Sequence, residues 1–264
     1  MNCIRISLIS ILLSLLLNDS INAQTIIRPQ PIAGKKLTND FIIQHLVYPD
    51  EALEQKQGGK ITVKFTVDKN GDAYGHHVDE HFNEECAKEA IHLVKLIQWK
   101  PATNNALPCD YNHEFVVEFS PKNYNKNIEK NIIKFIPKQE LPTEKSYKIY
   151  DFKELDEAPK PYFNNQNVTI GAYLRTELIY PDHAKEFEIS GTVKIDFIIE
   201  TDGKASNITI ENSVGGGCDN EAIRLIQNLT WIPGVKNDSI VRTHTTQDIT
   251  FQFGERNYHD GNQY

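Results

Sequence analysis

Three side chains of this sequence have the types and the spacing that hold a transition-metal ion. His77, Asp79 and His81 occupy alternate positions at a predicted strand, and alternate strand residues share one face of a sheet. Two imidazoles and a carboxylate are suitable ligands for zinc or copper. An ordinary solvated polar face is the alternative, so the sequence leaves both a metal site and a plain surface open here.

The four cysteines are too few for a disulfide-stapled scaffold, so the fold depends on a buried core. Cys86 and Cys218 each precede a predicted helix, where a small apolar side chain packs well, and Asp219 is expected to be the N-cap of the second helix. Cys109 lies in a predicted loop. A disulfide with Cys86 and a free reactive thiol both remain open for it.

No arrangement of residues in the sequence indicates catalysis. Gly215-Gly216-Gly217 lies where a phosphate-binding loop could, but the Lys-Ser/Thr pair that completes such a loop does not follow. The motifs of serine hydrolases, zinc proteases and cysteine proteases do not occur either. We therefore expect a protein that is not an enzyme and needs no cofactor.

The composition is that of a globular protein with an acidic surface. The 264 residues are 24% charged and 39% hydrophobic, which excludes the disordered, collagen-like and multi-span membrane classes. The 28 Lys and Arg residues are outnumbered by 36 Asp and Glu residues, giving a net charge of −8. Because affinity for nucleic acids comes from neutralising phosphates, we expect no nucleic-acid partner.

Residues 1–23 have the three-part layout of a cleavable signal peptide. Arg5 precedes an apolar stretch over residues 6–17, and Ala23 ends a cleavage site before Gln24. As a helix, the apolar stretch would rise roughly 18 Å, which is short of a hydrocarbon core of about 30 Å. The sequence therefore predicts export and cleavage, and the alternative is a retained membrane anchor.

The rest of the chain is a tandem duplication. A shift of 132 residues aligns residues 48–101 with 180–233 without a gap, and 16 of the 54 aligned pairs are identical, where ordinary composition gives about three. The identical pairs include a Tyr-Pro pair, a turn glycine and a Trp-x-Pro motif, namely Tyr48/Tyr180, Pro49/Pro181, Gly71/Gly203, Trp99/Trp231 and Pro101/Pro233. The histidine cluster described above has no counterpart in the second copy.

Each copy predicts the same series of elements. An amphipathic helix leads into Tyr-Pro, where the proline begins a short second helix. Two paired strands follow, then a core-facing helix that ends at Trp-x-Pro, and then a last strand. The first helix, the paired strands and the last strand are expected at residues 41–47, 61–67, 73–80 and 115–119, and in the second copy at 173–179, 193–199, 205–212 and 249–253.

The order and spacing of these motifs, found twice, resemble the C-terminal domain of TonB, the periplasmic protein that delivers proton-motive work to outer-membrane transporters. The motifs are Tyr-Pro-x-x-Ala, Gly-x-Val-x-Val-x-Phe, Asp-Gly, Glu-Ala-Ile and Trp-x-Pro, and the second copy matches them more closely.

We divide the chain into a signal peptide at 1–23, a lead-in at 24–40, a first domain at 41–120, a linker at 121–148 with at most one docked strand, a second domain at 149–254 and a polar tail at 255–264.

The resemblance implies the α+β class, with two tandem domains that each pack a three-stranded antiparallel sheet on one long helix and carry a short N-terminal helix. Family members recognise an extended peptide of a transporter by adding it beside the last strand, and an exposed sheet edge suits this role because its main-chain groups are unpaired. The strand positions expected to flank the peptide are Val117, Phe119, Ile249, Phe251 and Phe253. The alternative is that these residues are simply strand core.

The chain also departs from the well-known transducers. They place Gln-Pro just before Tyr-Pro, whereas the matching positions here hold His45-Leu46 and Glu177-Leu178. They also carry a full-length membrane helix and a Pro-rich spacer, whereas only Pro29 and Pro31 lie between the signal-like segment and the first domain.

We expect a periplasmic protein that binds peptides of an outer-membrane transporter or of another envelope protein, in TonB-dependent transport. A soluble adaptor or metal-binding protein without energy coupling is the alternative. A proton-motive complex of the inner membrane would be a partner only if the N-terminus is retained in that membrane.

Overall fold

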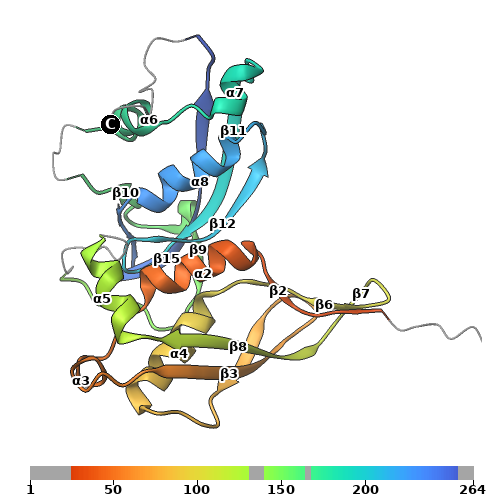
Figure 1. Cartoon of the computed structure of the whole chain (residues 1–264), viewed down its shortest axis with the longest axis vertical. Coiled ribbons are helices and arrows are strands. Elements are labelled where there is room, and N and C mark those ends of the chain that lie inside the picture. Colours follow the sequence, from red (N-terminus) through yellow and green to blue (C-terminus); the bar gives the residue numbers. More distant parts are fainter. Residues whose placement is uncertain (1–24, 131–139, 164–167, 255–264) are drawn as a thin grey trace, which may run out of the picture.

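A computed structural model of the chain describes residues 25–130, 140–163 and 168–254, and these residues form two α+β halves (Figure 1). The predicted signal peptide, residues 131–139 of the predicted linker and the predicted polar tail lie outside the described residues. No helix in the described ranges combines the length and the apolar character that crossing a bilayer requires.

The first half contains a three-stranded antiparallel sheet of order β4-β3-β8. A second, small sheet of order β1-β6-β7 projects from the body of this half (Figure 1). The elements of the first half are β1 (Ile26–Ile27), β2 (Gln30–Pro31), α2 (Gly34–His45), α3 (Asp50–Glu54), β3 (Gly59–Val67), β4 (Ala73–His77), α4 (Glu84–Leu96), β5 (Trp99–Lys100), β6 (Ala102–Asn104), β7 (Leu107–Cys109) and β8 (Tyr111–Phe119).

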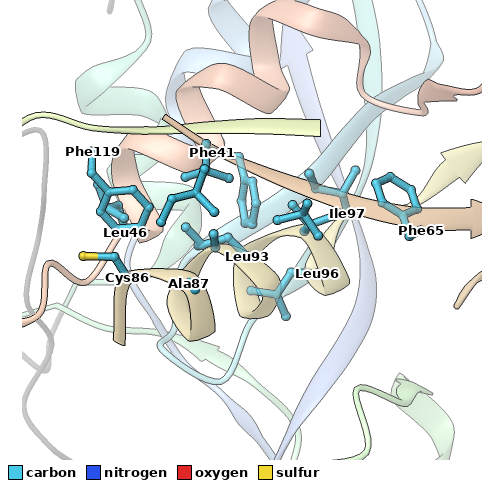
Figure 2. Packing of buried hydrophobic residues seen from close by; sticks show 14 of the residues in the cluster. Phe41, Leu46, Phe65, Cys86, Ala87, Leu93, Leu96, Ile97 and Phe119 are labelled. Carbon is cyan, nitrogen blue, oxygen red and sulfur yellow. The ribbon is translucent and has the colours of Figure 1, made fainter. Parts of the chain in front are cut away.

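The core of the first half lies between the sheet and helix α4. Alternate residues of β3, from Ile61 to Val67, are buried, as the period of two predicts. Helix α4 turns its apolar stripe toward them, and Figure 2 shows Leu93 of α4, Phe41 of α2 and Phe119 of β8 in this cluster. The amphipathic pattern at 41–47 thus belongs to a longer helix, α2, which begins at Gly34.

The second half repeats this plan with a larger sheet. Its main path is β12-β11-β15-β14, and β9 also pairs with β15. The elements are β9 (Ile149–Asp151), the 3₁₀ helix η1 (Phe152–Glu154), β10 (Lys160–Pro161), α6 (Ile170–Glu177), α7 (Asp182–Glu186), β11 (Gly191–Ile199), β12 (Ala205–Asn212), α8 (Cys218–Asn228), β13 (Trp231–Ile232), β14 (Gly234–Lys236) and β15 (Ser239–Phe251).

The predicted fold class is confirmed, and the two halves differ in one respect. In both halves the last strand begins earlier than predicted, at Tyr111 and at Ser239. Both halves have a two-residue turn with left-handed backbone before this strand, at Asn105-Ala106 and at Asn237-Asp238. In the second half the strand after the turn continues unbroken as β15, whereas in the first half it is interrupted at Asp110, between β7 and β8. The second sheet therefore has more than the three predicted strands.

The segment between the halves is more ordered than a linker. Helix α5 (Pro121–Glu129) begins with a proline at its start and with Ser120 as N-cap, and it packs Tyr124 on Tyr48 of the first core. Farther along, Thr143 and strand β9 pair in parallel with β15. Both ends of the segment are thus anchored on the two halves.

The two halves also contact each other directly, with α2 of the first against β12 of the second (Figure 1). Asn207 of β12 is buried, donates to the Leu96 carbonyl at 2.9 Å and accepts from the Gln98 N–H at 2.8 Å. Arg242 of β15 donates to the same Leu96 carbonyl at 2.9 Å. The end of α4 is therefore held by two polar side chains of the other half.

Candidate peptide-binding edges

The first sheet has two edges, and only one is a regular template for another strand. Strand β8 pairs with β3 without interruption, from Gly59 opposite Phe119 to Val67 opposite Tyr111. Within the described residues no strand pairs with its other edge. The opposite edge strand, β4, is short and irregular, with a register shift and with Gly75 at φ 70°. Such irregularity protects an edge from pairing.

The side chains of β8 divide between the core and the solvent. Val117 and Phe119, which were expected to flank a peptide, are fully buried. Glu114, Val116 and Glu118 point to the exposed face. Val117 and Phe119 therefore act as core residues that hold the strand, while the backbone edge and the exposed face are what a peptide would meet.

In the second half, the corresponding strand is already partly paired. Ile249 and Phe251 of β15 are buried, and Phe253 lies beyond the strand, 43% exposed, with its ring near Tyr180. At its outer edge, β15 pairs with Thr143 through Ile240 and with β9 through residues 242–244. Strand β14 pairs with residues 239–241 from the other side. Only residues 245–251 keep an outer edge without a described strand beside it.

The two copies therefore differ at equivalent positions. Residues 240–244 of β15 correspond to residues 108–112 of β7 and β8 under the shift of 132. In the second copy this stretch carries β9 in parallel, and the Glu144 N–H donates to the Ile240 carbonyl at 2.9 Å. In the first copy β6 pairs with β7 through residues 107–109, as β14 does with β15, but no described strand lies at the position equivalent to β9. The fold thus accepts an added strand at this place, and in the first copy the place is open.

An open hollow of about 630 Å³ adjoins the first part of β8. Lys64 and Thr66 of β3, His77 of β4 and Asn112 and Glu114 of β8 are among the residues that line it. The Thr66 hydroxyl donates to the Asn112 side chain at 2.9 Å. The hollow is polar and gives room for the side chains of a segment that lies along the edge.

The motif residues shared by the two copies are structural. Tyr48 and Tyr180 are buried, and their hydroxyls donate to the carbonyls of Gln57 and Ile189 at 2.5 Å. Helices α3 and α7 begin one residue after Pro49 and Pro181. The turn residues Gly71 and Gly203 have φ of 96° and 74°. Trp99 and Trp231 pack on Phe65 and Phe197, and Pro101 and Pro233 directly follow the two-residue strands β5 and β13.

The glutamates of the shared Glu-Ala-Ile motif have a role that the sequence did not predict. Glu89 and Glu221 are identical in the two copies, and their carboxylates accept the N–H groups of Val47 and Ile179 at 2.9 and 2.7 Å. Glu221 also pairs with Arg224 at 2.7 Å. Burial raises the pKa of Glu89 to about 7. Each carboxylate holds the backbone that leads into Tyr-Pro.

The candidate metal ligands are not gathered into one site. Asp79 pairs with Lys64 at 2.5 Å, His77 lies 3.7 Å from Asp79, and His81 pairs with Glu84 at 3.1 Å. Among the described residues, no group of three His, Cys, Asp or Glu side chains is arranged to hold a metal ion.

The three described cysteines are free thiols. Cys86 and Cys218 are buried, and burial raises the pKa of Cys86 to about 11, so its thiol is unreactive at neutral pH. Asp219 is not the N-cap of α8, and that expectation was wrong. Gly217 holds the N-cap position in the left-handed conformation, while Asp219 accepts the Val214 N–H at 3.0 Å. The glycine-rich turn thus replaces a side-chain cap.

Comparison with known families gives one match that covers both copies. A family model described as the Gram-negative bacterial TonB protein C-terminal matches residues 44–121 and 176–253. No match is found among curated proteins.

Proposed function

Because the chain belongs to the family of TonB protein C-terminal domains, we propose that it binds extended peptides of outer-membrane transporters by strand addition at β8. Domains of this family are periplasmic and non-catalytic. The observation that carries the proposal is the edge of β8, which is regular over nine residues and pairs only with β3 among the described residues. Unpaired main-chain groups in such a row bind an extended segment through a ladder of hydrogen bonds.

The second copy supports this proposal from within the same chain. Strand β9 lies in parallel against β15 at the positions that match the start of β8. An added strand is therefore compatible with the domain, and the open copy is the first one. We assign the first domain as the binding module and the second as a domain whose equivalent edge is occupied by β9 at residues 242–244.

The test is site-specific photo-crosslinking on living cells. A photoreactive residue replaces Val116, which is 47% exposed on β8, and in a matched control it replaces Tyr74, which is 53% exposed on β4 at the other edge of the same sheet. We expect crosslinks from position 116, and not from 74, to an extended segment of an outer-membrane transporter, identified by mass spectrometry of the crosslinked peptide. Equal crosslinking from both edges would contradict strand addition at β8.

The cell compartment of the protein needs a separate measurement. We propose that it is a periplasmic protein released by cleavage after Ala23. Its intact mass, taken from the native envelope, should begin at Gln24, and the protein should partition to the soluble periplasmic fraction. A mass that includes Met1, with partitioning to the inner membrane, would instead support a directly energised transducer.

A further inference from the structure

The exposed face of β8 carries two carboxylates on either side of one apolar side chain. Glu114, Val116 and Glu118 alternate along the strand and share the solvent face, with Val116 47% exposed. Their partners across the ladder on β3 are Lys64, Thr62 and Lys60. An added strand on the open edge would place its own side chains beside these three, about 4.5–5.5 Å away between Cβ atoms.

Neither carboxylate is bonded to its cross-strand lysine, although the charge of Glu114 still acts on Lys64. The ammonium of Lys64 is bonded to Asp79 at 2.5 Å instead of Glu114. Within the described residues, neither Glu114 nor Glu118 takes part in an ion pair or a hydrogen bond through its side chain. Because an unpaired charge on an edge strand also repels like-charged segments, these two residues affect which peptides can be added.

The pattern belongs to the first copy and is not required by the fold. The corresponding positions of β15 hold Thr246, Asp248 and Thr250, which also lie on the exposed face. Thus the order acidic, apolar, acidic is replaced there by polar, acidic, polar. The two carboxylates therefore lie on the strand whose edge is open, where a bound peptide would contact them.

We propose, on the basis of the proposed function, that the edge of β8 selects extended segments with basic side chains at two positions four residues apart and an apolar side chain midway. The basic residues lie beside Glu114 and Glu118, and the apolar one lies beside Val116. The net charge of −8 adds a long-range attraction for such a segment. Opposite charges across strands contribute roughly 0.2–1 kcal/mol per pair, and like charges oppose pairing.

The test uses three blocked synthetic peptides with the full-length exported protein. The first is Thr-Thr-Lys-Thr-Val-Thr-Lys-Thr-Thr, and the other two carry Glu or Gln in place of both lysines. NMR titration gives their affinities, and amide protection along residues 111–119 shows whether each peptide adds to β8. We expect the lysine peptide to bind about 4- to 30-fold more tightly than the glutamate peptide, and the difference to shrink at high salt.

Charge-swapped variants make the test specific. The double variant Glu114→Lys with Glu118→Lys changes only exposed side chains, and it should reverse the preference, so that the glutamate peptide binds better. The matched control, Thr246→Lys with Thr250→Lys, places the same charges on β15 and should leave the preference unchanged.

The outcomes separate the selection rule from the proposed function. If the neutral peptide protects β8 while the charge swap leaves the preference unaltered, strand addition stands and the basic-segment rule is wrong. If none of the three peptides protects the amides of β8, strand addition at this edge is contradicted, and the proposed selection of basic segments is contradicted as well.

Discussion

At the scale of single residues, the two copies keep the same buried polar contacts. In each copy a tyrosine hydroxyl donates a hydrogen bond to the carbonyl nine residues later in the chain. In each copy a glutamate carboxylate also accepts the backbone N–H of the residue before Tyr-Pro. These contacts fix the short segment that joins the first helix to the sheet. They explain why the residues recur at a shift of 132 although much of the surrounding surface differs.

The tyrosine contact can be measured in both copies. In Tyr48→Phe, the Gln57 carbonyl loses its buried donor, and we expect the free energy of unfolding to fall by about 1–3 kcal/mol, because an unsatisfied buried polar group is costly. Tyr180→Phe removes the equivalent bond to Ile189 and should cost a similar amount. Urea unfolding measures both, and a loss confined to one copy would show that the duplicated contact isn't equivalent.

The Glu89 carboxyl should make stability depend on pH. Burial raises its pKa from 4.5 to about 7, so between these values the folded state binds more protons than the unfolded state. Stability therefore falls as pH rises through this window. In Glu89→Gln the amide oxygen can still accept the Val47 N–H, and we expect that part of the pH dependence to disappear.

Urea unfolding at pH 5 and pH 7.5 compares this variant with the parent. The matched variant, Glu221→Gln, weakens the pair that Glu221 makes with Arg224 at 2.7 Å and should destabilise the protein at pH 7.5. An unchanged pH dependence in Glu89→Gln would mean that Glu89 is not the group responsible.

At the scale of elements, the hairpin between β3 and β4 depends on one close approach. Gly71 has φ 96°, and a Cβ there would lie 2.5 Å from the Trp99 carbonyl oxygen. We expect Gly71→Ala to cost more than 2 kcal/mol, because left-handed strain and a backbone clash add together. Gly75→Ala is the control, since φ is 70° with no atom within 4 Å, and it should cost only about 1–2 kcal/mol.

The melting temperatures of the two alanine variants test this difference. Equal decreases in melting temperature for the two variants would show that the Trp99 carbonyl moves aside in Gly71→Ala. The destabilisation would then come only from the backbone conformation of Gly71.

Elements that repeat and that follow a hydrophobic period were predictable. The paired strands, the core-facing helices and the Tyr-Pro and Trp-x-Pro junctions lie where the duplicated pattern indicates. The burial of Val117, Phe119, Ile249 and Phe251 follows from the same alternation. Glu89 and Glu221 were also visible as an identical pair, but their role depends on a backbone N–H 42 residues away.

Elements and contacts that depend on residues far apart in the chain could not be predicted. Strand β9 pairs with β15 across about ninety residues of chain and has too short a pattern of its own. Asn207 of the second copy corresponds to Gly75 of the first copy, and both residues have left-handed backbones. Only the docked halves show that the asparagine side chain binds the end of α4.

At the scale of the whole molecule, the halves are joined through a buried arginine of the second half. Arg242 makes two bonds to the Glu200 carboxylate, at 2.7 and 2.8 Å, and also donates to carbonyls of Leu96 and Tyr147. Both side chains of the pair are at most 7% exposed. A single arginine thus links the second sheet to the first half and to the segment that precedes β9.

Arg242→Ala should weaken this docking strongly. It removes the bond to the Leu96 carbonyl of the first half. It also leaves the Glu200 carboxylate of the second half buried without its partner, and removing one member of such a pair costs about 3–5 kcal/mol. We expect one cooperative unfolding transition in the parent and two in the variant, measured by calorimetry. Asn207→Ala removes only neutral hydrogen bonds and should weaken docking less. A single transition at the parent temperature in Arg242→Ala would show that the halves are held together by other contacts.

The pairing of β9 with β15 has a consequence for how copies of the protein can associate. A chain with two full-length open edges could join a neighbour at each end, and such head-to-tail contacts grow into open filaments. Because the chain covers residues 240–244 of β15 with its own segments, β8 is the one of the two last strands that offers a full-length edge. Association through the last strands then ends at a closed pair, so two copies of the domain in one chain do not lead to a polymer through these strands.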